Sequence, residues 1–292
     1  MKKVVVIGGS GFLGSHVADY LTISGYKTTI FDKKLSPWLS KKQNMIIGDI
    51  LDKDSLNQAI SGAYAVYNFA GISDLNWSLD RPIDSAEINI IGNLNIMEAC
   101  LKKKVNRYIF ASTVYVQSNE GGFYRCSKIA CEKYIEEYKN IYGLNYTILR
   151  YGSLYGPRAD DNNGILKILK KAIKDKRLIY EGHQDTTREY IHVLDAAEAT
   201  VLSLNTGFKN QTLTLTGQQT IKVIDLLKMI GEILNIPENK TKIVKKRQIG
   251  HYIRTPYAQQ NKFTKKLVPN KYIDLGEGIL QIIEELNQTN YE

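Results

Sequence analysis

The sequence predicts an α/β fold in which a doubly wound, mostly parallel sheet of the Rossmann type is joined to a smaller α/β lobe. Three observations carry this prediction. A β-branched run at residues 3–7 leads directly into a glycine-rich turn at residues 8–14. Apolar runs of strand length then alternate with helical segments as far as residue 150, which favours parallel strands joined by crossover helices. Beyond residue 150 the segments become shorter and their alternation loosens.

The expected strands of the first half are short, continuous apolar runs, as in strands that are buried on both faces of a parallel sheet. The first helix follows the glycine turn with apolar residues at helical spacing, Phe12, Leu13, Val17 and Leu21. Pro82 favours the start of a long helix, because proline fits a first helical turn. The expected strands are 3–7, 27–31, 45–47, 65–69, 107–112 and 145–150, and the expected helices are 12–24, 52–60, 82–103 and 123–142.

The second half predicts the smaller lobe, without a linker in front of it. We expect a cofactor domain at residues 1–150 and a mainly substrate-binding lobe at residues 151–292, with some segments of the second half returning to the core of the first. The expected helices are 164–174, 193–205, 221–234 and 277–286, and the expected strands are 178–180 and 212–215.

Composition excludes several classes of function. The chain has 39 Lys and Arg against 30 Asp and Glu, a net charge of +9, but its basic residues are scattered in short pairs. We therefore expect no nucleic-acid partner. A positive field that gathers phosphorylated small molecules fits better, and a lysine-rich composition without such a role fits equally well. Three cysteines without a CxxC spacing predict a reduced, cytoplasmic setting. No apolar run approaches the roughly 18 residues of a membrane span, and no cluster of His, Cys and acids has metal-ligand spacing, so neither a membrane nor a metal site is expected.

The turn that contains Gly8, Gly11 and Gly14 predicts dinucleotide binding. A Cβ at these positions would keep a diphosphate away from the backbone, and the helix that follows offers free N–H groups and the positive end of its dipole. Asp32 ends the next expected strand, where a carboxylate accepts hydrogen bonds from adenosine ribose hydroxyls and repels a 2′-phosphate. NAD is therefore favoured over NADP, although Lys33 directly after it softens the preference. The alternative is that the glycines only make a tight turn.

Two residues on the expected helix 123–142 predict acid–base chemistry. Tyr124 and Lys128 are four residues apart, a spacing that places both side chains on one helix face. An ammonium beside a phenol favours the phenolate and should lower the tyrosine pKa from about 10. Tyr124 is thus a candidate general acid/base. A pair of this kind also arises by chance on surface helices, so its weight depends on the other motifs.

Together the motifs resemble those of the extended short-chain dehydrogenase/reductase family, the nucleotide-sugar epimerases and dehydratases. The resemblance covers nearly the whole chain. Its motifs are Gly8-x-x-Gly11-x-x-Gly14, Asp32, Asp49-Ile50, Asn89-x-x-Gly92, Ser112-Thr113, Tyr124-x-x-x-Lys128, LRYGSLYGPR at 149–158 and REYIHVLD at 188–195.

The resemblance implies a mechanism. Tyr124 takes the proton of a sugar hydroxyl while the carbon is oxidised by NAD, Lys128 lowers the tyrosine pKa and holds the nicotinamide ribose, and Thr113 bonds the reacting oxygen, with Ser112 as the fallback. Asp49 is expected either at the adenine amino group or as a helix cap. The expected cofactor residues are Gly8, Gly11, Phe12, Leu13, Gly14, Asp32, Lys33, Asp49, Ile50, Phe69, Ala70, Gly71, Asn89, Tyr124, Lys128 and Tyr151.

Arg188 is the main candidate for the substrate diphosphate, because a guanidinium pairs well with phosphate; a surface salt bridge is the alternative. Asn163 is expected to cap the next helix and leave backbone amides free for a phosphate; the alternative is that it serves only as a helix cap. Ser153 stands where related enzymes place an asparagine that contacts substrate, and residues 255–257 and 265–266 are further candidates near the nucleotide. His192 is expected to be structural.

Departures from the family pattern narrow the activity. No carboxylate follows Thr113 before Glu120, so a 4,6-dehydratase would lack its acid. An epimerase acting at C4 of a nucleotide-diphosphate sugar is expected first. A C4 dehydrogenase or reductase, for instance on a GDP-heptose of a bacterial capsule cluster, and a non-catalytic NAD(H)-binding protein are the alternatives. The helices at 82–103 and 123–142 carry apolar residues on more than one face, which predicts a homodimer or burial within one subunit.

Overall fold

The computed structural model describes residues 1–246, 250–254, 265–268 and 272–289. Its centre is an eight-stranded sheet in which all neighbouring strands run parallel. The order β14-β11-β6-β5-β4-β1-β2-β3 reverses direction between β1 and β4, where doubly wound sheets bind ligands. The strands are β1 Lys3–Ile7, β2 Lys27–Asp32, β3 Asn44–Ile47, β4 Ala65–Asn68, β5 Arg107–Thr113, β6 Tyr146–Tyr151, β11 Gln211–Leu215 and β14 Lys265–Lys266.

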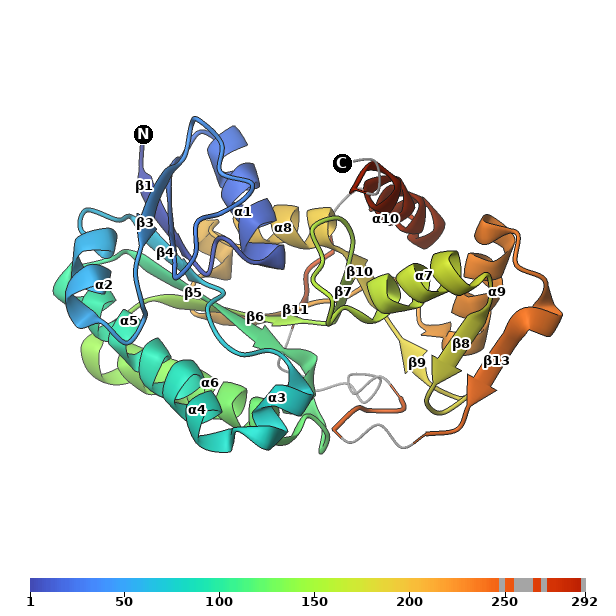
Figure 1. Ribbon diagram of the computed structural model, residues 1–292. Coiled ribbons are helices and arrows are strands. Elements are labelled where there is room, and N and C mark those ends of the chain that lie inside the picture. Colours follow the sequence, from blue (N-terminus) through green and yellow to red (C-terminus); the bar gives the residue numbers. More distant parts are fainter. Residues whose placement is uncertain (247–249, 255–264, 269–271, 290–292) are drawn as a thin grey trace.

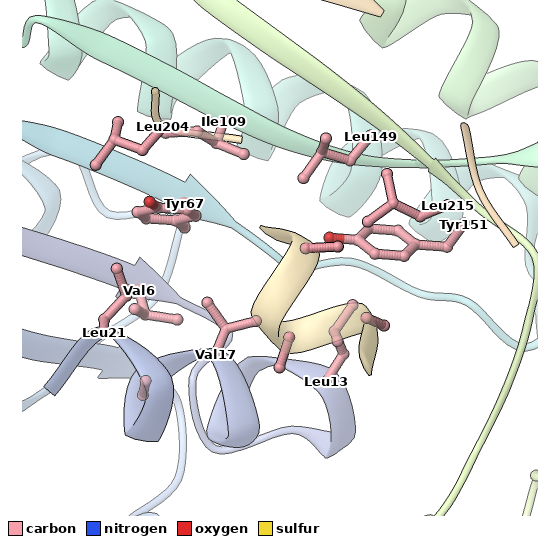
Figure 2. Close-up of a cluster of buried hydrophobic side chains, with 14 of the residues drawn as sticks. Val6, Leu13, Val17, Leu21, Tyr67, Ile109, Leu149, Tyr151, Leu204 and Leu215 are labelled. Carbon is pink, nitrogen blue, oxygen red and sulfur yellow. The ribbon is translucent and has the colours of Figure 1, made fainter. Parts of the chain in front are cut away.

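Helices cover both faces of this sheet, as Figure 1 shows. On one face α1 (Phe12–Ile23) packs beside α8 (Val193–Leu202). On the other lie α2 (Lys53–Ile60), α5 (Gly92–Lys102) and α6 (Gly122–Tyr142). The core under α1 and α8 is drawn in Figure 2, where side chains of strands from both halves of the chain meet. The predicted α/β fold is confirmed.

The expected helix 82–103 is a continuous helical path with an irregularity in it. It consists of α4 (Pro82–Ala86), a turn of π-helix (Glu87–Ile91) and α5. A π-turn inserts an extra residue into the helix and is frequent at functional sites. Here it carries the buried side chain of Asn89. The short helix α3 (Leu75–Asp80) was not expected from the sequence; Asp74 caps it by accepting from the Trp77 N–H.

The smaller lobe has its own apolar core, built from α7 (Gly164–Asp175), α9 (Val223–Leu234) and α10 (Leu275–Thr289). Three two-stranded pairs accompany them. They are β7 (Ser153–Tyr155) with β10 (Tyr190–His192), β9 (Thr187–Arg188) with β12 (Ile221–Lys222), and β8 (Leu178–Glu181) with β13 (Thr241–Val244). Segments after residue 150 contribute to both parts, because β11 and α8 pack in the larger one. Short 3₁₀ turns occur at Val114–Gln117, Thr206–Phe208 and Glu238–Lys240.

In the described part of the chain, no helix is both long enough and apolar enough to pass through a membrane.

Buried ionisable groups lie where the two parts of the molecule meet. The His16 Nε2–H donates to the Pro157 carbonyl at 3.0 Å, and His192 accepts from the Leu194 N–H at the start of α8. Burial lowers the pKa of both imidazoles to about 4. Asp195 has the opposite shift, since burial raises its pKa to about 6. In the folded protein, both histidines are therefore neutral at neutral pH, whereas the Asp195 carboxyl binds a proton more readily than it does in the unfolded chain.

These shifts predict how stability depends on pH. Between pH 6.5 and 4 each histidine is protonated in the unfolded chain and neutral in the folded one, so its contribution to stability is lost as the pH falls. Asp195 works against this loss, because the folded state binds its proton first. His192→Asn keeps an acceptor at the start of α8 and removes one titrating group. We expect this variant to lower the slope of unfolding free energy against pH by up to about 1.4 kcal/mol per pH unit near pH 5, measured by urea unfolding. An unchanged slope would contradict the assignment.

Candidate active site

The glycine turn is held by contacts that leave no room for side chains. Gly8 has a φ of +77°, and a Cβ there would lie 2.5 Å from the amide nitrogen of Ala70. A Cβ on Gly14 would lie 2.2 Å from the Gly8 carbonyl oxygen. Among the residues that the structure describes, no side chain caps α1, whose N-cap residue is Gly11. The turn thus packs against the end of β4 and leaves the positive end of α1 open for a diphosphate.

Asp32 is anchored at the end of β2, beside this turn. Its carboxylate accepts from the Ser10 N–H at 3.0 Å and from the Lys34 N–H at 3.3 Å. A carboxylate has about four lone-pair positions, so acceptor capacity remains for ribose hydroxyls. Lys33 turns away and pairs with Asp49 at 2.9 Å.

Asp49 does not cap the helix that follows it. Its Oδ1 accepts from the Leu51 N–H at 3.0 Å, while Asp52 caps α2 by accepting from the Asp54 N–H. The capping alternative for Asp49 is therefore wrong, and its position at the adenine end of the site stays a prediction. The neighbouring Ile50 is buried and fills the space above Gly92, where a Cβ would come within 2.4 Å of the Ile50 side chain.

Asn89 ties the loop after β4 to the helix α6. Its Oδ1 accepts from the Ile72 N–H at 2.6 Å, and its Nδ2 donates to the Ile72 carbonyl and the Ser127 hydroxyl at 3.0 Å each. A Cβ on Gly71 would lie 2.7 Å from the Asn89 Oδ1 and 3.9 Å from the Lys128 Nζ. The segment formed by Phe69, Ala70 and Gly71 thus runs between the glycine turn and Lys128.

Three expected cofactor residues direct their side chains elsewhere. Figure 2 shows Leu13 and Tyr151 within the core cluster, and the Tyr151 hydroxyl lies 2.6 Å from that of Thr200. The half-buried Phe12 ring packs edge-on against His16. Any contact of Leu13 or Tyr151 with a cofactor would have to come from the main chain.

The structure brings Thr113, Tyr124 and Lys128 together at the carboxyl end of β5. All three are buried, with exposed fractions of 6%, 9% and 7%. The Lys128 Nζ donates to the Ala111 carbonyl at 2.8 Å and lies 5.9 Å from the centroid of the Tyr124 ring. α6 supplies the phenol and the amine from one face, as the four-residue spacing predicts.

Electrostatics in this cluster differ from the expectation. Burial raises the pKa of Tyr124 to about 12, and a hydrogen bond with Thr113 opposes this rise. The expectation that Lys128 brings the tyrosine pKa below about 10 is wrong for the protein by itself, because desolvation of the phenolate is the largest cause of the shift and raises the pKa. Burial likewise lowers the pKa of Lys128, with Cys131 and Glu132 acting in the opposite direction.

Ser112 and Thr113 are adjacent in β5 but have different partners. The Ser112 hydroxyl donates to the Glu132 Oε1 at 2.5 Å. Thr113 is the hydroxyl that bonds Tyr124, and its Oγ1 also accepts from the Tyr115 N–H at 3.3 Å. The geometry favours Thr113 for contact with a reacting oxygen.

Two aromatic residues that sequence reasoning missed connect Tyr124 to the smaller lobe. Tyr115 packs edge-on against Tyr124 with ring centroids 6.4 Å apart, and Tyr252 lies 4.9 Å from Tyr115. The Arg188 guanidinium lies 4.2 Å from the Tyr252 ring centroid, and the Ser153 hydroxyl lies 3.4 Å from that of Tyr252. Tyr115, two residues after Thr113, could have been placed near the site; nothing in the sequence around Tyr252 marks it.

Other candidates are used structurally or lie elsewhere. Asn163 caps α7 by accepting from the N–H groups of Ile165 and Leu166, and it donates to the Leu154 carbonyl, as its plain capping alternative predicts. Lys266 is held by Glu189 and the Gly217 carbonyl. Residues 255–257 lie outside the described part of the chain.

Comparisons with known proteins place these features in context. A model of the NAD dependent epimerase/dehydratase family matches residues 4–215. A putative UDP-glucose 4-epimerase of Methanocaldococcus jannaschii is 29% identical, with 98% of this chain and 99% of the relative covered. A UDP-N-acetyl-alpha-D-glucosaminuronate decarboxylase of Bacillus cytotoxicus is also 29% identical, with 83% of each covered. The structure of a Thermotoga maritima UDP-glucose 4-epimerase with UDP-glucose has a TM-score of 0.83 at 24% identity, covering 99% of each chain.

The position of Asp32 predicts the cofactor preference. We expect NAD to bind at least about ten times more tightly than NADP, because a 2′-phosphate would meet the carboxylate. Asp32→Ala should narrow this ratio, measured by calorimetric titration of both cofactors, while Asp52→Ala at the exposed cap of α2 leaves it unchanged. A wild-type protein that prefers NADP would show that Asp32 does not select the ribose.

Proposed function

Because the chain belongs to the NAD dependent epimerase/dehydratase family, we propose that it oxidises a nucleotide-diphosphate sugar at C4 and reduces the 4-keto sugar again from its other face. The observation that carries this proposal is the buried convergence of Thr113, Tyr124 and Lys128 beside the glycine turn. The epimerase relative matches this chain over nearly its whole length, with 98% of the chain covered. A protein that only bound the cofactor would have no use for a buried phenol at this point.

Each of the three residues has a separate role in the proposed reaction. The Tyr124 oxygen takes the proton of the C4 hydroxyl and returns it later. The Thr113 hydroxyl bonds the same sugar oxygen and holds it against the phenol. Lys128 has three N–H donors, of which the Ala111 carbonyl takes one, so donors remain for the nicotinamide ribose. Bound NAD supplies the two-electron acceptor and a positive ring charge that favours the tyrosinate.

The substrate end of the site is proposed to lie in the smaller lobe, residues 151–292. Arg188 donates one hydrogen bond to the Thr187 carbonyl, and its guanidinium carbon lies over the Tyr252 ring, 4.2 Å from the ring centroid. That arrangement favours bidentate pairing with a diphosphate. Ser153 lies beside the same tyrosine and would contact the sugar.

Glu120, the first carboxylate after Thr113, is exposed, which argues against a 4,6-dehydratase.

The most specific part of the proposal is the identity of the sugar and of its nucleotide. The three relatives named above are described by UDP-sugars, so UDP-sugars come first. A GDP-heptose from a capsule cluster stays a prediction.

Incubation with NAD and a panel of UDP-, GDP- and dTDP-sugars separates the alternatives. A changed sugar without reduced cofactor indicates an epimerase, and persistent NADH absorbance indicates a dehydrogenase. No change with any sugar would contradict the catalytic proposal.

We also propose a cytoplasmic location. Cys100, Cys126 and Cys131 are all free thiols, and Cys126 is exposed. An exposed thiol persists in a reducing compartment, whereas secreted proteins usually pair their cysteines.

Substitution of the three hydroxyl residues tests their roles. Tyr124→Phe should lower kcat at least about a thousandfold, since it removes the group that transfers the proton. Thr113→Val should lower kcat about a hundredfold, because it removes the bond to the reacting oxygen. Ser112→Ala should have a smaller effect, about tenfold or less. Rates are measured on the sugar that the wild type converts. If Ser112→Ala lost more activity than Thr113→Val, the assignment of the two would be reversed.

A homodimer is proposed through the outer faces of α4, the π-turn and α6, which lie side by side in Figure 1. One side of α6 carries Phe123 and Tyr134, exposed by 48% and 46%, with Ala130 between them. Ile83 and Ile91 are exposed by 80% and 48% on the neighbouring helix. A stripe at helical spacing on two adjacent helices fits helix packing between two copies.

Charge placed in this stripe should break the dimer. We expect Tyr134→Glu to give a monomer in analytical ultracentrifugation, because two copies of the new carboxylate would be buried against apolar surface. Ile224→Glu, at an exposed position of α9 in the smaller lobe, is the matched control and should leave the mass unchanged. A wild-type monomer at micromolar concentration would contradict the proposed dimer.

A further inference from the structure

Helix α6 buries a third ionisable residue one turn beyond Lys128. Glu132 is 4% exposed. Its two carboxylate oxygens accept from the Arg150 Nε at 2.9 Å and the Arg150 Nη2 at 2.6 Å. The Oε1 also accepts from the Ser112 hydroxyl at 2.5 Å. None of these three residues is used by the proposed proton transfer.

The partners of Glu132 come from two adjacent strands at the edge where the site is built. Ser112 and Arg150 are direct neighbours in the parallel pairing of β5 with β6. Ser112 immediately precedes Thr113. A single carboxylate that binds both strand ends fixes α6 along its axis and in rotation about it. Tyr124 and Lys128 lie on the same face of that helix, two turns and one turn before Glu132.

We propose that Glu132 is a positioning residue for the Tyr124–Lys128 pair: it fastens α6 to Ser112 and Arg150, so that phenol and ammonium meet Thr113 and the nicotinamide ribose. This inference rests on the proposed function. It also gives Ser112 a defined role, since its hydroxyl acts through Glu132 and not on the substrate.

The charge of Glu132 supports the same role. Lys128 is buried, and burial alone favours its neutral form. The acidic groups that act on it are Cys131 and Glu132. Burial raises the pKa of the Cys131 thiol to about 11, so this thiol keeps its proton at neutral pH. Arg150 faces Glu132 and donates to both of its carboxylate oxygens. The carboxylate thus helps Lys128 remain a donor with three N–H groups.

Stability alone does not account for this cluster. Buried ion pairs are on average no more stabilising than apolar residues of similar volume. The neighbouring sheet-facing positions of α6 are filled by Cys131 and Ile135, both fully buried, so apolar packing is available at this interface. What an apolar side chain could not do is bind two strand ends with directional hydrogen bonds.

The test compares Glu132→Gln with Glu136→Gln on the same helix. Glu136 forms an exposed ion pair with Lys133 at 2.8 Å and serves as the control. We expect Glu132→Gln to lower kcat at least tenfold with less than a threefold change in KM, and to weaken NAD binding at least fivefold by calorimetry. Glu136→Gln should match the wild type in all three. The double variant Glu132→Gln/Arg150→Met removes both charges and should regain most of the wild-type Tm while its kcat stays low.

Two results would overturn the proposal. One is wild-type kcat and NAD affinity in Glu132→Gln; the other is recovery of kcat together with Tm in the double variant, which would mean that the cluster serves folding only. Failure of the proposed function is seen separately, as a wild type that converts no sugar of the panel. The NAD affinities of the same variants then still decide whether Glu132 positions Lys128.

Discussion

The arrangement of the site depends on one constraint: α6 turns polar side chains toward a sheet that is buried on both faces. Tyr124, Ser127, Lys128 and Glu132 all lie on its inner side. Buried polar groups must be hydrogen-bonded, because each unpaired one costs about 1–3 kcal/mol. Their partners are therefore fixed in place: the Ala111 carbonyl for Lys128, Asn89 for Ser127, and Ser112 with Arg150 for Glu132. The need to satisfy the hydrogen bonds of these groups holds α6 in position.

Burial places Tyr124 and Lys128 together, but it also disfavours the charged forms that the proposed proton transfer needs. A phenolate and an ammonium are both disfavoured in a dry environment, so the pKa of Tyr124 rises and that of Lys128 falls. Other interactions must therefore stabilise the charged forms of these two groups. Thr113 does so for the tyrosine and Glu132 for the lysine, and the positive nicotinamide ring would add to the first when it is bound. In the proposed reaction, ionisation of the Tyr124 phenol therefore depends on Thr113 and on the bound cofactor.

How much of this the sequence could predict depends on the length of the pattern involved. The six strands of the first half and the glycine turn repeat a long alternation, and Tyr124 with Lys128 follows from helical spacing alone. The strands of the smaller lobe are two to four residues long, which is short for periodicity to mark, and among those that the structure describes only β8 (Leu178–Glu181) was expected. Asp49 was left open because a carboxylate after a strand end serves an adenine amino group or a helix cap equally well. The Glu132 cluster joins three segments distant in sequence, and no local pattern identifies such a contact.

The loop between β5 and α6 shows how the two lobes come to share one site. It is short, and it turns into the helix through Gly121 and Gly122, whose φ angles of +102° and +52° other residues rarely adopt. A Cβ on Gly121 would lie 2.9 Å from the Tyr115 ring, so the glycine lets Tyr115 lie flat against the start of α6. Tyr115 then contacts Tyr124 on one side and Tyr252 on the other, and the Gly121 N–H donates to the Gly250 carbonyl at 2.8 Å. The residues proposed to face the sugar hydroxyl and those proposed for the substrate diphosphate are thereby joined by direct contacts. A shift of the smaller lobe would therefore change the packing around the Tyr124 phenol.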